Sequence, residues 1–259
     1  MPIADGGVPH REGRTLMLLP NLPEEGQGPR TKSSGRVFYN PAMAGSRTRS
    51  VLLFRHALDL GILGEGTVYA LDGLTASGLR ARRWLNELSP EETDRISATI
   101  VDLEEEALRW AEASHSEFPP RGGGILEPSK GDLRSVVLRS GRHWVDIDPY
   151  GSPMPFIDSA MQSMARSGVM EVSATDTAAL TGSSRTALMR RYGARVRTDS
   201  LAHDSGMRVM LATFSRVAAR HDRSIVPLLS VWDSHHLRVS FRVLKSVSSA
   251  NELEDSIGW

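Results

Sequence analysis

Hydrophobic residues recur with two different spacings along this chain of 259 residues. Short apolar runs are typical of buried strands, and longer segments with an apolar residue every three or four positions are typical of helices. Strands are predicted at residues 68–71, 96–101, around Ile125, and at 144–147 and 169–174. Helices are predicted at residues 47–60, 79–88, 103–117, about 154–165, and 205–221. This alternation predicts an α/β fold with a doubly wound, mostly parallel sheet.

The ends of the chain follow a different pattern. Two strands expected at 225–231 and 237–244 are joined through residues 232–236, which predicts an antiparallel hairpin at one edge of the sheet. Residues 1–36 are rich in Gly, Pro and charge, so we expect a loosely structured arm with a short strand at 15–19 and a mobile linker at 21–34. The predicted domains are the arm and linker (1–36), a main domain (37–249) and a frayed tail (250–259).

Amino-acid composition excludes only a few classes of protein. The 31 Lys and Arg residues balance 31 Asp and Glu residues, so the net charge does not indicate a nucleic-acid partner. The chain has no cysteine, which excludes disulfides and thiolate-bound metals. No apolar run approaches the roughly 18 residues of a membrane span, and no signal-peptide pattern is present. We therefore expect a cytoplasmic protein without a membrane partner. His203, His235 and His236 lack the spacing of metal ligands, so no metal site is expected.

An acidic residue follows each of four consecutive predicted strands, and these residues are Asp72, Asp102, Asp132 and Asp148. In an open α/β sheet, ligands bind outside the carboxyl ends of the strands. The loop after the first strand carries Gly73 and Gly78, without the G-x-G-x-x-G spacing of a pyrophosphate loop. An acid there would repel phosphate but can hold an ammonium group, while the next two acids suit a ribose diol and an adenine amine. Together they predict S-adenosylmethionine; the alternative is a tight turn against a helix start.

The fourth strand, Trp144 to Ile147, runs into the sequence Asp148-Pro149-Tyr150. Such a strand end combines a carboxylate, a backbone carbonyl in a fixed direction and a ring that can stack on a flat substrate. Amino-group methyltransferases use this combination to hold the exocyclic amine of a base. The simpler interpretation of the same residues is a tight turn at the end of an acidic strand.

From about Val37 to Leu244, the chain resembles the tRNA (guanine-26-N2) dimethyltransferase family. The matching segments are, in order, residues 37–41 with Met43 and Arg47, 71–80, 146–153, 174–178 with Gly182, 190–192, and His203 with Gly206 and Arg208. The first loop alone has low specificity. The segment 146–153 followed by 173–178 is highly specific, and the ordered set is more specific still.

The resemblance implies a class I, Rossmann-like methyltransferase that uses S-adenosyl-L-methionine to methylate the N2 amine of guanine 26 in tRNA. It assigns cofactor contacts to residues at the first three strand ends and to one arginine, namely Arg47, Asp72, Gly73, Gly78, Asp102 and Asp132. It assigns catalysis to Asp148, with Pro149 and Tyr150 beside it, and places Phe38 near the target base. A dense group of arginines that includes Arg190 and Arg191 is a candidate for RNA contact.

In the expected reaction, Asp148 holds the amine of a flipped-out base and takes its proton, and the base stacks on Tyr150 or Phe38. Asp146, two residues earlier, is either a residue that orients the site or a capping acid. Two alternatives stay open. The same fold acts on another RNA or a base-like molecule, or the chain is a non-catalytic RNA-binding accessory protein.

Three departures from the family pattern bear on these expectations. Tyr150 stands where relatives often carry Phe, which keeps a stacking face. Residues 233–238 differ from the aromatic ending usual at that point. Family members usually continue into a C-terminal tRNA-binding domain, and this sequence ends at Trp259, so we expect a natural minimal form, a fragment, or a different mode of RNA docking. A protein partner or a second chain is one candidate source of the missing grip on tRNA.

Overall fold

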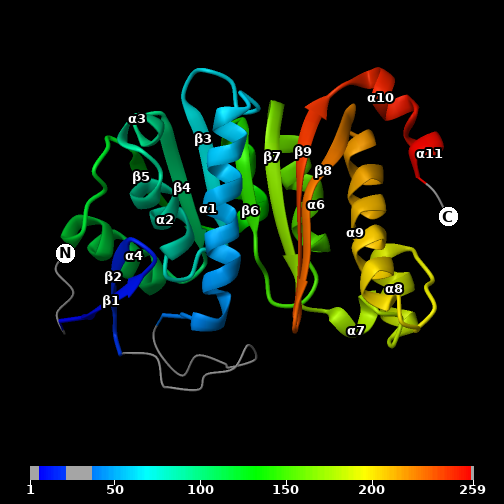
Figure 1. Ribbon diagram of the computed structural model, residues 1–259, viewed down its shortest axis with the longest axis horizontal. Helices are drawn as coiled ribbons and strands as arrows, with labels where there is room; N and C mark the ends of the chain where they lie inside the picture. Colours follow the sequence, from blue (N-terminus) through cyan, green and yellow to red (C-terminus); the bar gives the residue numbers. More distant parts are fainter. Residues whose placement is uncertain (1–5, 22–36, 258–259) are drawn as a thin grey trace. The chain divides into compact units, whose positions relative to one another are not determined.

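A computed structural model describes residues 6–21 and 37–257, which belong to two compact units, Met1–Val136 and Val137–Trp259 (Figure 1). Each unit contains a group of adjacent strands flanked by helices. Most of the predicted elements are present with similar bounds. Within the described residues, no helix has the length and apolar character needed to cross a membrane.

The first unit is built on three parallel strands in the order β5-β4-β3. Their bounds are β3 Val68–Gly73, β4 Ile96–Asp102 and β5 Ile125–Lys130. The helices of this unit are η1 Pro41–Met43, α1 Ala44–Asp59, α2 Leu79–Glu87, α3 Pro90–Thr93, α4 Glu105–Glu117 and α5 Leu133–Val136. Both α2 and α4 contact β4, and their buried side chains share the core with Leu71 and Ile100. The strand–helix alternation predicted from the sequence is confirmed here.

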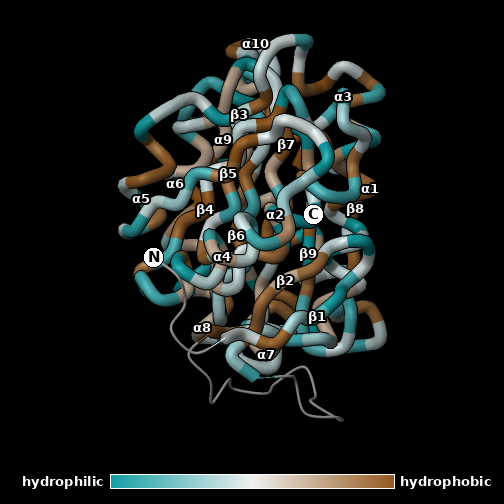
Figure 2. The backbone as a smooth tube through the Cα atoms, turned by 90° about the vertical axis from the view of Figure 1, so that its left-hand side faces the viewer, coloured by the Kyte–Doolittle hydropathy of each residue, from teal (hydrophilic) through white to brown (hydrophobic). Residues whose placement is uncertain are grey.

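The expectation of a loosely structured arm is wrong for residues 6–21. The predicted strand at 15–19 is β2 (Thr15–Leu19), and it pairs in antiparallel fashion with β1 (Val8–Glu12). Much of β2 is coloured as hydrophobic in Figure 2, and Met17 and Leu19 pack on Leu79 of α2. The sequence pattern did not reveal this packing because the five-residue strand buries its apolar face only against distant helices. Most of the predicted linker at 21–34 lies outside the described residues.

The second unit contains four strands in the order β6-β7-β9-β8. Their bounds are β6 Arg142–Ile147, β7 Met164–Ala174, β8 Arg223–Asp233 and β9 His236–Lys245. β6 and β7 are parallel, whereas β9 is antiparallel to both β7 and β8, so the predicted antiparallel edge hairpin is confirmed. The helices are η2 Val137–Arg139, α6 Met154–Ser163, α7 Thr177–Leu180, α8 Arg185–Tyr192, α9 Ala202–Ala219, α10 Val247–Asn251 and α11 Leu253–Ser256.

The expected frayed tail at 250–259 is also a wrong prediction for the described part of that segment. Residues 247–256 form α10 and α11, and both helices pack against α9. The side chain of Ser246 caps α10 by accepting a hydrogen bond of 3.2 Å from the amide of Ser249. Figure 1 shows this terminal helical segment beside α9. Residues 258–259 lie outside the described chain.

The register of the second unit brings three chain segments to one edge. Ile147 of β6 pairs with Val172 of β7, and Ala174 of β7 pairs with Leu237 of β9. Because β9 runs against β7, its first residues lie beside the carboxyl ends of the two parallel strands. Asp148, Thr175 and His236 therefore leave or enter the strands at the same edge, which is where ligands bind in folds of this kind.

Candidate functional site

The loop that follows β3 is held by its own polar contacts. The carboxylate of Asp72 is only 3% exposed and accepts hydrogen bonds from the hydroxyl of Thr75 at 2.7 Å and the amide of Ala81 at 3.3 Å. Leu74 and Ala76 have positive φ angles of 61° and 49°, a conformation that costs energy for residues other than glycine. Backbone strain of this kind clusters at ligand sites. The loop is therefore a fixed structure with an acid at its base.

The two glycines of this loop have different surroundings. Gly73 is the last residue of β3 and is buried. Gly78 is the N-cap of α2 and has a φ angle of 68°, and a Cβ atom there would lie 2.5 Å from the Cβ of Ala111 in α4. Close helix packing therefore explains Gly78 without a ligand, in agreement with the alternative interpretation of the loop as a turn against a helix start.

The acids after β4 and β5 are held by different groups. Asp102 accepts hydrogen bonds from two backbone amides, those of Ala76 at 2.8 Å and Glu104 at 3.0 Å. Asp132 instead forms an ion pair with Arg134, with 2.5 Å between Nη2 and Oδ2. Hydrogen bonds from the side chain and amide of Arg134 lower the pKa of Asp132 to about 2. Asp132 is thus ionised at neutral pH, and hydrogen bonds hold both carboxylates in fixed orientations.

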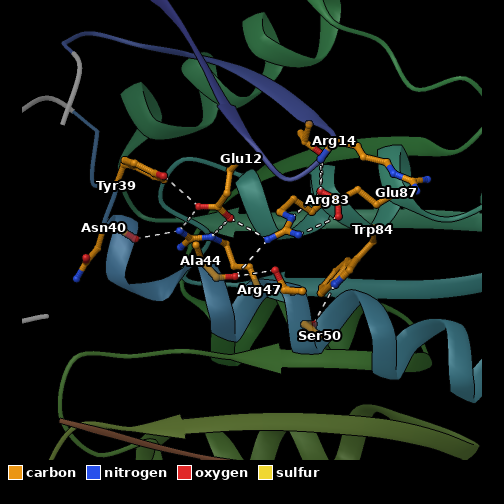
Figure 3. A network of polar contacts seen from close by, with 12 residues as sticks. Glu12, Arg14, Tyr39, Asn40, Ala44, Arg47, Ser50, Arg83, Trp84 and Glu87 are labelled. Atoms are coloured by element: carbon orange, nitrogen blue, oxygen red, sulfur yellow. Dashed lines mark hydrogen bonds and ion pairs between the residues drawn. The ribbon is translucent and has the colours of Figure 1, made fainter. Parts of the chain in front are cut away.

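Arg47 lies in a buried polar network shown in Figure 3. Its Nε and Nη2 atoms donate to the carboxylate of Glu12 at 2.7 and 2.5 Å, and Nη2 also donates to the carbonyl of Asn40 at 2.9 Å. The guanidinium carbon lies 5.3 Å from the ring centroid of Tyr39. The structure therefore gives Arg47 an internal partner, and its predicted contact with the cofactor stays a prediction.

Glu12 is the centre of this network, and the sequence did not single it out. Its carboxylate also accepts hydrogen bonds from Arg83 at 3.0 Å and from the hydroxyl of Tyr39 at 3.0 Å. Burial opposes its ionisation, but the bonds and charges of Arg47 and Arg83 outweigh burial and lower the pKa of Glu12. Phe38, which precedes Tyr39, is half-buried. The hairpin thus anchors the segment that carries the candidate base-contacting Phe38.

The turn after β6 is fastened to the end of β7. Gly151 has a φ angle of 82°, donates from its amide to the hydroxyl of Thr175 at 2.6 Å, and accepts at its carbonyl from the Thr175 amide at 2.9 Å. Pro149 is buried and Asp148 is half-buried. Tyr150, which lies between Pro149 and Gly151 in the chain, is 76% exposed. A fixed turn thus presents an aromatic ring to solvent beside a carboxylate.

A second anchor of this turn comes from α8. The Tyr192 hydroxyl lies 3.0 Å from Oγ of Ser152 and donates to Asp176 at 2.9 Å. Burial is the main cause that raises the pKa of Tyr192, so the hydroxyl keeps its proton. Arg191 is exposed but forms an ion pair with Asp176 at 2.9 Å, whereas Arg190 is exposed on the same helix. Tyr192 therefore has a clear structural role, and RNA contact by either arginine stays a prediction.

Beneath the turn lies a buried charge cluster made of Asp146, Glu171 and Arg238 from three neighbouring strands. Arg238 forms ion pairs with Asp146 and with Glu171, the latter at 2.8 Å, and donates to Oγ of Ser173 at 2.9 Å. Burial alone would lower the pKa of Arg238, but the charges of Asp146, Glu171 and Asp148 raise it. Asp146 is fully buried and paired, which favours an orienting role over a capping one.

The sequence did not single out Glu171 and Arg238, although a signal was present. Glu171 lies within the apolar run 169–174, and Arg238 lies within 237–244. Charged residues are almost never fully buried unless they are paired, so opposite charges in two predicted core strands indicate partners. Across the described ranges 6–21 and 37–257, no group of three or more acidic or histidine side chains is arranged to hold a metal ion.

Comparison with known proteins gives sequence matches over almost the whole chain. A family model described as N2,N2-dimethylguanosine tRNA methyltransferase matches residues 21–259. A tRNA (guanine(26)-N(2))-dimethyltransferase of Pyrobaculum calidifontis is 31% identical over 262 residues, which is 98% of this chain and 68% of that protein. The corresponding protein of Methanocorpusculum labreanum is 33% identical over 248 residues, 96% of this chain and 60% of that protein.

A solved structure agrees with these matches. Trm1 from Pyrococcus horikoshii, in complex with S-adenosyl-L-methionine, superposes with a TM-score of 0.77 at 25% identity, covering 95% of this chain and 64% of Trm1. This likeness confirms the predicted class I methyltransferase fold. The chain spans 65% of the length of the Thermococcus kodakarensis relative and 64% of the Thermoplasma volcanium relative. On the extent of these matches, the chain belongs to the N2,N2-dimethylguanosine tRNA methyltransferase family.

Proposed function

We propose that this protein is an enzyme that methylates the N2 amine of guanine 26 in tRNA, with S-adenosyl-L-methionine as the methyl donor. The observation that carries the proposal is the turn after β6, where the exposed ring of Tyr150 lies beside the Asp148 carboxylate. The names of the relatives and the complex of Trm1 with S-adenosyl-L-methionine support the substrate and donor.

The residues of the first unit fit this donor by their chemistry. S-adenosyl-L-methionine, when bound, supplies an electrophilic methyl group on a sulfonium, and it has an ammonium, a ribose diol and an adenine amine but no phosphate. Asp72, Asp102 and Asp132 are hydrogen-bond acceptors for these three groups. A carboxylate has about four lone-pair sites, and Asp102 accepts two hydrogen bonds from backbone amides, so it keeps acceptor capacity for a ligand. Asp132 accepts four hydrogen bonds from Arg134 and would exchange some of them for a bond from the ligand.

Arg47 is hydrogen-bonded to the segment that carries Phe38. The guanidinium of Arg47 is bound to Glu12 and to the carbonyl of Asn40, two residues after Phe38. We therefore assign Arg47 a contribution through the position of this segment, in addition to the cofactor role implied by the family. Phe38, which is half-buried, keeps its proposed place near the target base.

Asp148 is the proposed base. The exocyclic amine of guanine is a poor nucleophile because its lone pair is delocalised into the ring. A carboxylate that accepts a hydrogen bond from the amine and takes its proton as the methyl group arrives contributes about 10²- to 10⁴-fold in rate. Pro149 fixes the backbone so that a carbonyl can accept the second N–H of the amine.

The target base has to leave its stack to reach this carboxylate, as in other enzymes that modify bases. The exposed Tyr150 ring offers a face for the extruded base, and stacking of one base on an aromatic ring contributes about 1–3 kcal/mol. Arg190, exposed on α8, is a candidate for phosphate contact. Arg191 would make such a contact while paired with Asp176.

The test is transfer of a labelled methyl group to unmodified tRNA, followed by digestion and identification of the methylated nucleoside. We expect N2-methylated guanosine at position 26, and Asp148→Asn should lower the single-turnover rate by about 10²- to 10⁴-fold while binding of S-adenosyl-L-methionine is unchanged. Asp158→Asn is the matched control, because Asp158 is an exposed acid of the same unit on α6.

Two results would contradict the proposal. One is the absence of methyl transfer by the wild type to any tRNA despite binding of S-adenosyl-L-methionine, which would favour a non-catalytic RNA-binding role. The other is a nucleoside methylated at any position other than N2 of guanosine, which would redirect the proposal to another target atom or base. Full activity of Asp148→Asn would remove the assignment of the base and leave the reaction standing.

A further inference from the structure

His236 is a buried histidine at the edge of the second unit that carries Asp148. It is the first residue of β9, next to Leu237, which pairs with Ala174 at the carboxyl end of β7. Figure 1 shows β9 beside β7. The side chain is only 7% exposed. Asp148 follows β6, and β6 and β9 both pair with β7, so Asp148 and His236 lie at the same edge of the sheet. The negative charge of Asp148 acts to raise the pKa of the imidazole.

The two ring nitrogens of His236 have different surroundings. Nδ1 lies 3.3 Å from the carbonyl oxygen of Asp233, and a carbonyl oxygen can only accept a hydrogen bond. Nδ1 therefore carries the proton in the neutral ring, and Nε2 presents its lone pair. Nε2 is buried and finds no hydrogen-bond partner within residues 6–21 and 37–257. A buried acceptor without a partner is rare and calls for a ligand or a bound solvent molecule.

The charge state of the ring supports this assignment. Burial, with help from the positive charge of Arg238, lowers the pKa of His236 and outweighs the negative charges of Asp148 and Asp233. The imidazole is therefore neutral at pH 7, and Nε2 remains a hydrogen-bond acceptor at the sheet edge that also carries the Asp148 carboxylate, a second acceptor. The edge thus offers two acceptors, one directly after β6 and one at the start of β9.

We propose that Nε2 of His236 accepts a hydrogen bond from the ring N1–H of the guanine whose N2 amine is held by Asp148, and so selects guanine as the substrate. This inference rests on the proposed function and deepens it. Guanine carries a ring N–H donor next to its exocyclic amine, whereas adenine and cytosine carry a ring nitrogen acceptor in that place. Two adjacent acceptors therefore match guanine and oppose the other amine-bearing bases.

The discriminating substrate is tRNA with 2,6-diaminopurine at position 26. This base keeps the 2-amine but has an N1 acceptor in place of N1–H. With the wild type, kcat/KM should favour guanine over 2,6-diaminopurine by roughly 10- to 100-fold, the range expected when a buried acceptor loses its partner. His236→Leu should abolish most of this preference. His236→Gln, which retains an acceptor oxygen, should restore part of it.

His235→Leu is the matched control, because it changes the neighbouring histidine of the same turn and should keep the preference. A merely structural role of His236 would lower the activity with both bases equally and leave their ratio intact. An unchanged ratio in His236→Leu, or a wild type that does not prefer guanine, would overturn this inference while the proposed methylation stands. Failure of the wild type to methylate any tRNA would instead overturn the proposed function and this inference with it.

Discussion

The contribution of Glu12 to the stability of the first unit can be predicted from its contacts. Glu12→Gln removes a carboxylate that binds Arg47 at 2.5 Å and Arg83 at 3.0 Å, with side-chain exposures of 7% for Glu12, 10% for Arg47 and 3% for Arg83. Removal of one partner of a buried ion pair costs about 3–5 kcal/mol, because the other charge stays buried without compensation. Arg83 keeps its ion pair with Glu87 at 2.6 Å, so we expect the lower end of this range.

The assay is hydrogen exchange of the β1 and β2 amides, which measures the local opening of the hairpin. A loss of about 3 kcal/mol corresponds to opening that is more than 100-fold more frequent. Glu105→Gln is the matched control. Glu105 also binds two cations, Arg109 at 2.6 Å and Lys130 at 2.9 Å, but its side chain is 52% exposed. Exposed ion pairs contribute little, so this variant should exchange like the wild type.

The stability that Glu12 contributes depends on pH, because folding lowers the pKa of its carboxyl group. The folded-state pKa of Glu12 is lower than its ordinary value of 4.5, so the stability it contributes is fully present above pH 4.5. That stability is lost as the pH falls through the folded-state pKa. The difference between the wild type and Glu12→Gln should therefore shrink in acid. Equal exchange in Glu12→Gln and Glu105→Gln at neutral pH would refute the reasoning.

Two further predictions concern the loops at the strand ends. Gly78→Ala should lower the free energy of unfolding in urea by about 1–3 kcal/mol more than Gly61→Ala does. The two glycines have similar φ angles of 68° and 65°, but only a methyl group at residue 78 would lie 2.5 Å from Ala111. Equal losses of stability in the two variants would contradict the packing argument. Asp132 should titrate with a pKa of about 2 by NMR, and Arg134→Ala should return it toward 3.8, whereas an unshifted pKa in the wild type would contradict the ion pair.

The period of apolar residues predicted most strands and helices because it depends on each segment alone. β6 was expected at 144–147 and is Arg142–Ile147, and α2 was expected at 79–88 and is Leu79–Glu87. α1 begins at Ala44, before the predicted 47, because Asn40 caps η1 and the chain continues directly into the helix. The acids at the strand ends were identified for the same reason, since a strand end is visible in the local sequence.

Tertiary structure alone decided which polar groups meet. Glu12 and Arg47 are 35 positions apart, and Asp146 and Arg238 are 92 positions apart, so no local pattern predicts either pair. The same holds for the hairpin of residues 8–19, whose residues Met17 and Leu19 pack on Leu79, and for the helices of residues 247–256, which contact α9. The surroundings of His236 were also decided by tertiary structure. A turn histidine in the sequence became, through the antiparallel register of β9, a buried acceptor near Asp148, because strand pairing brings together residues that the chain separates.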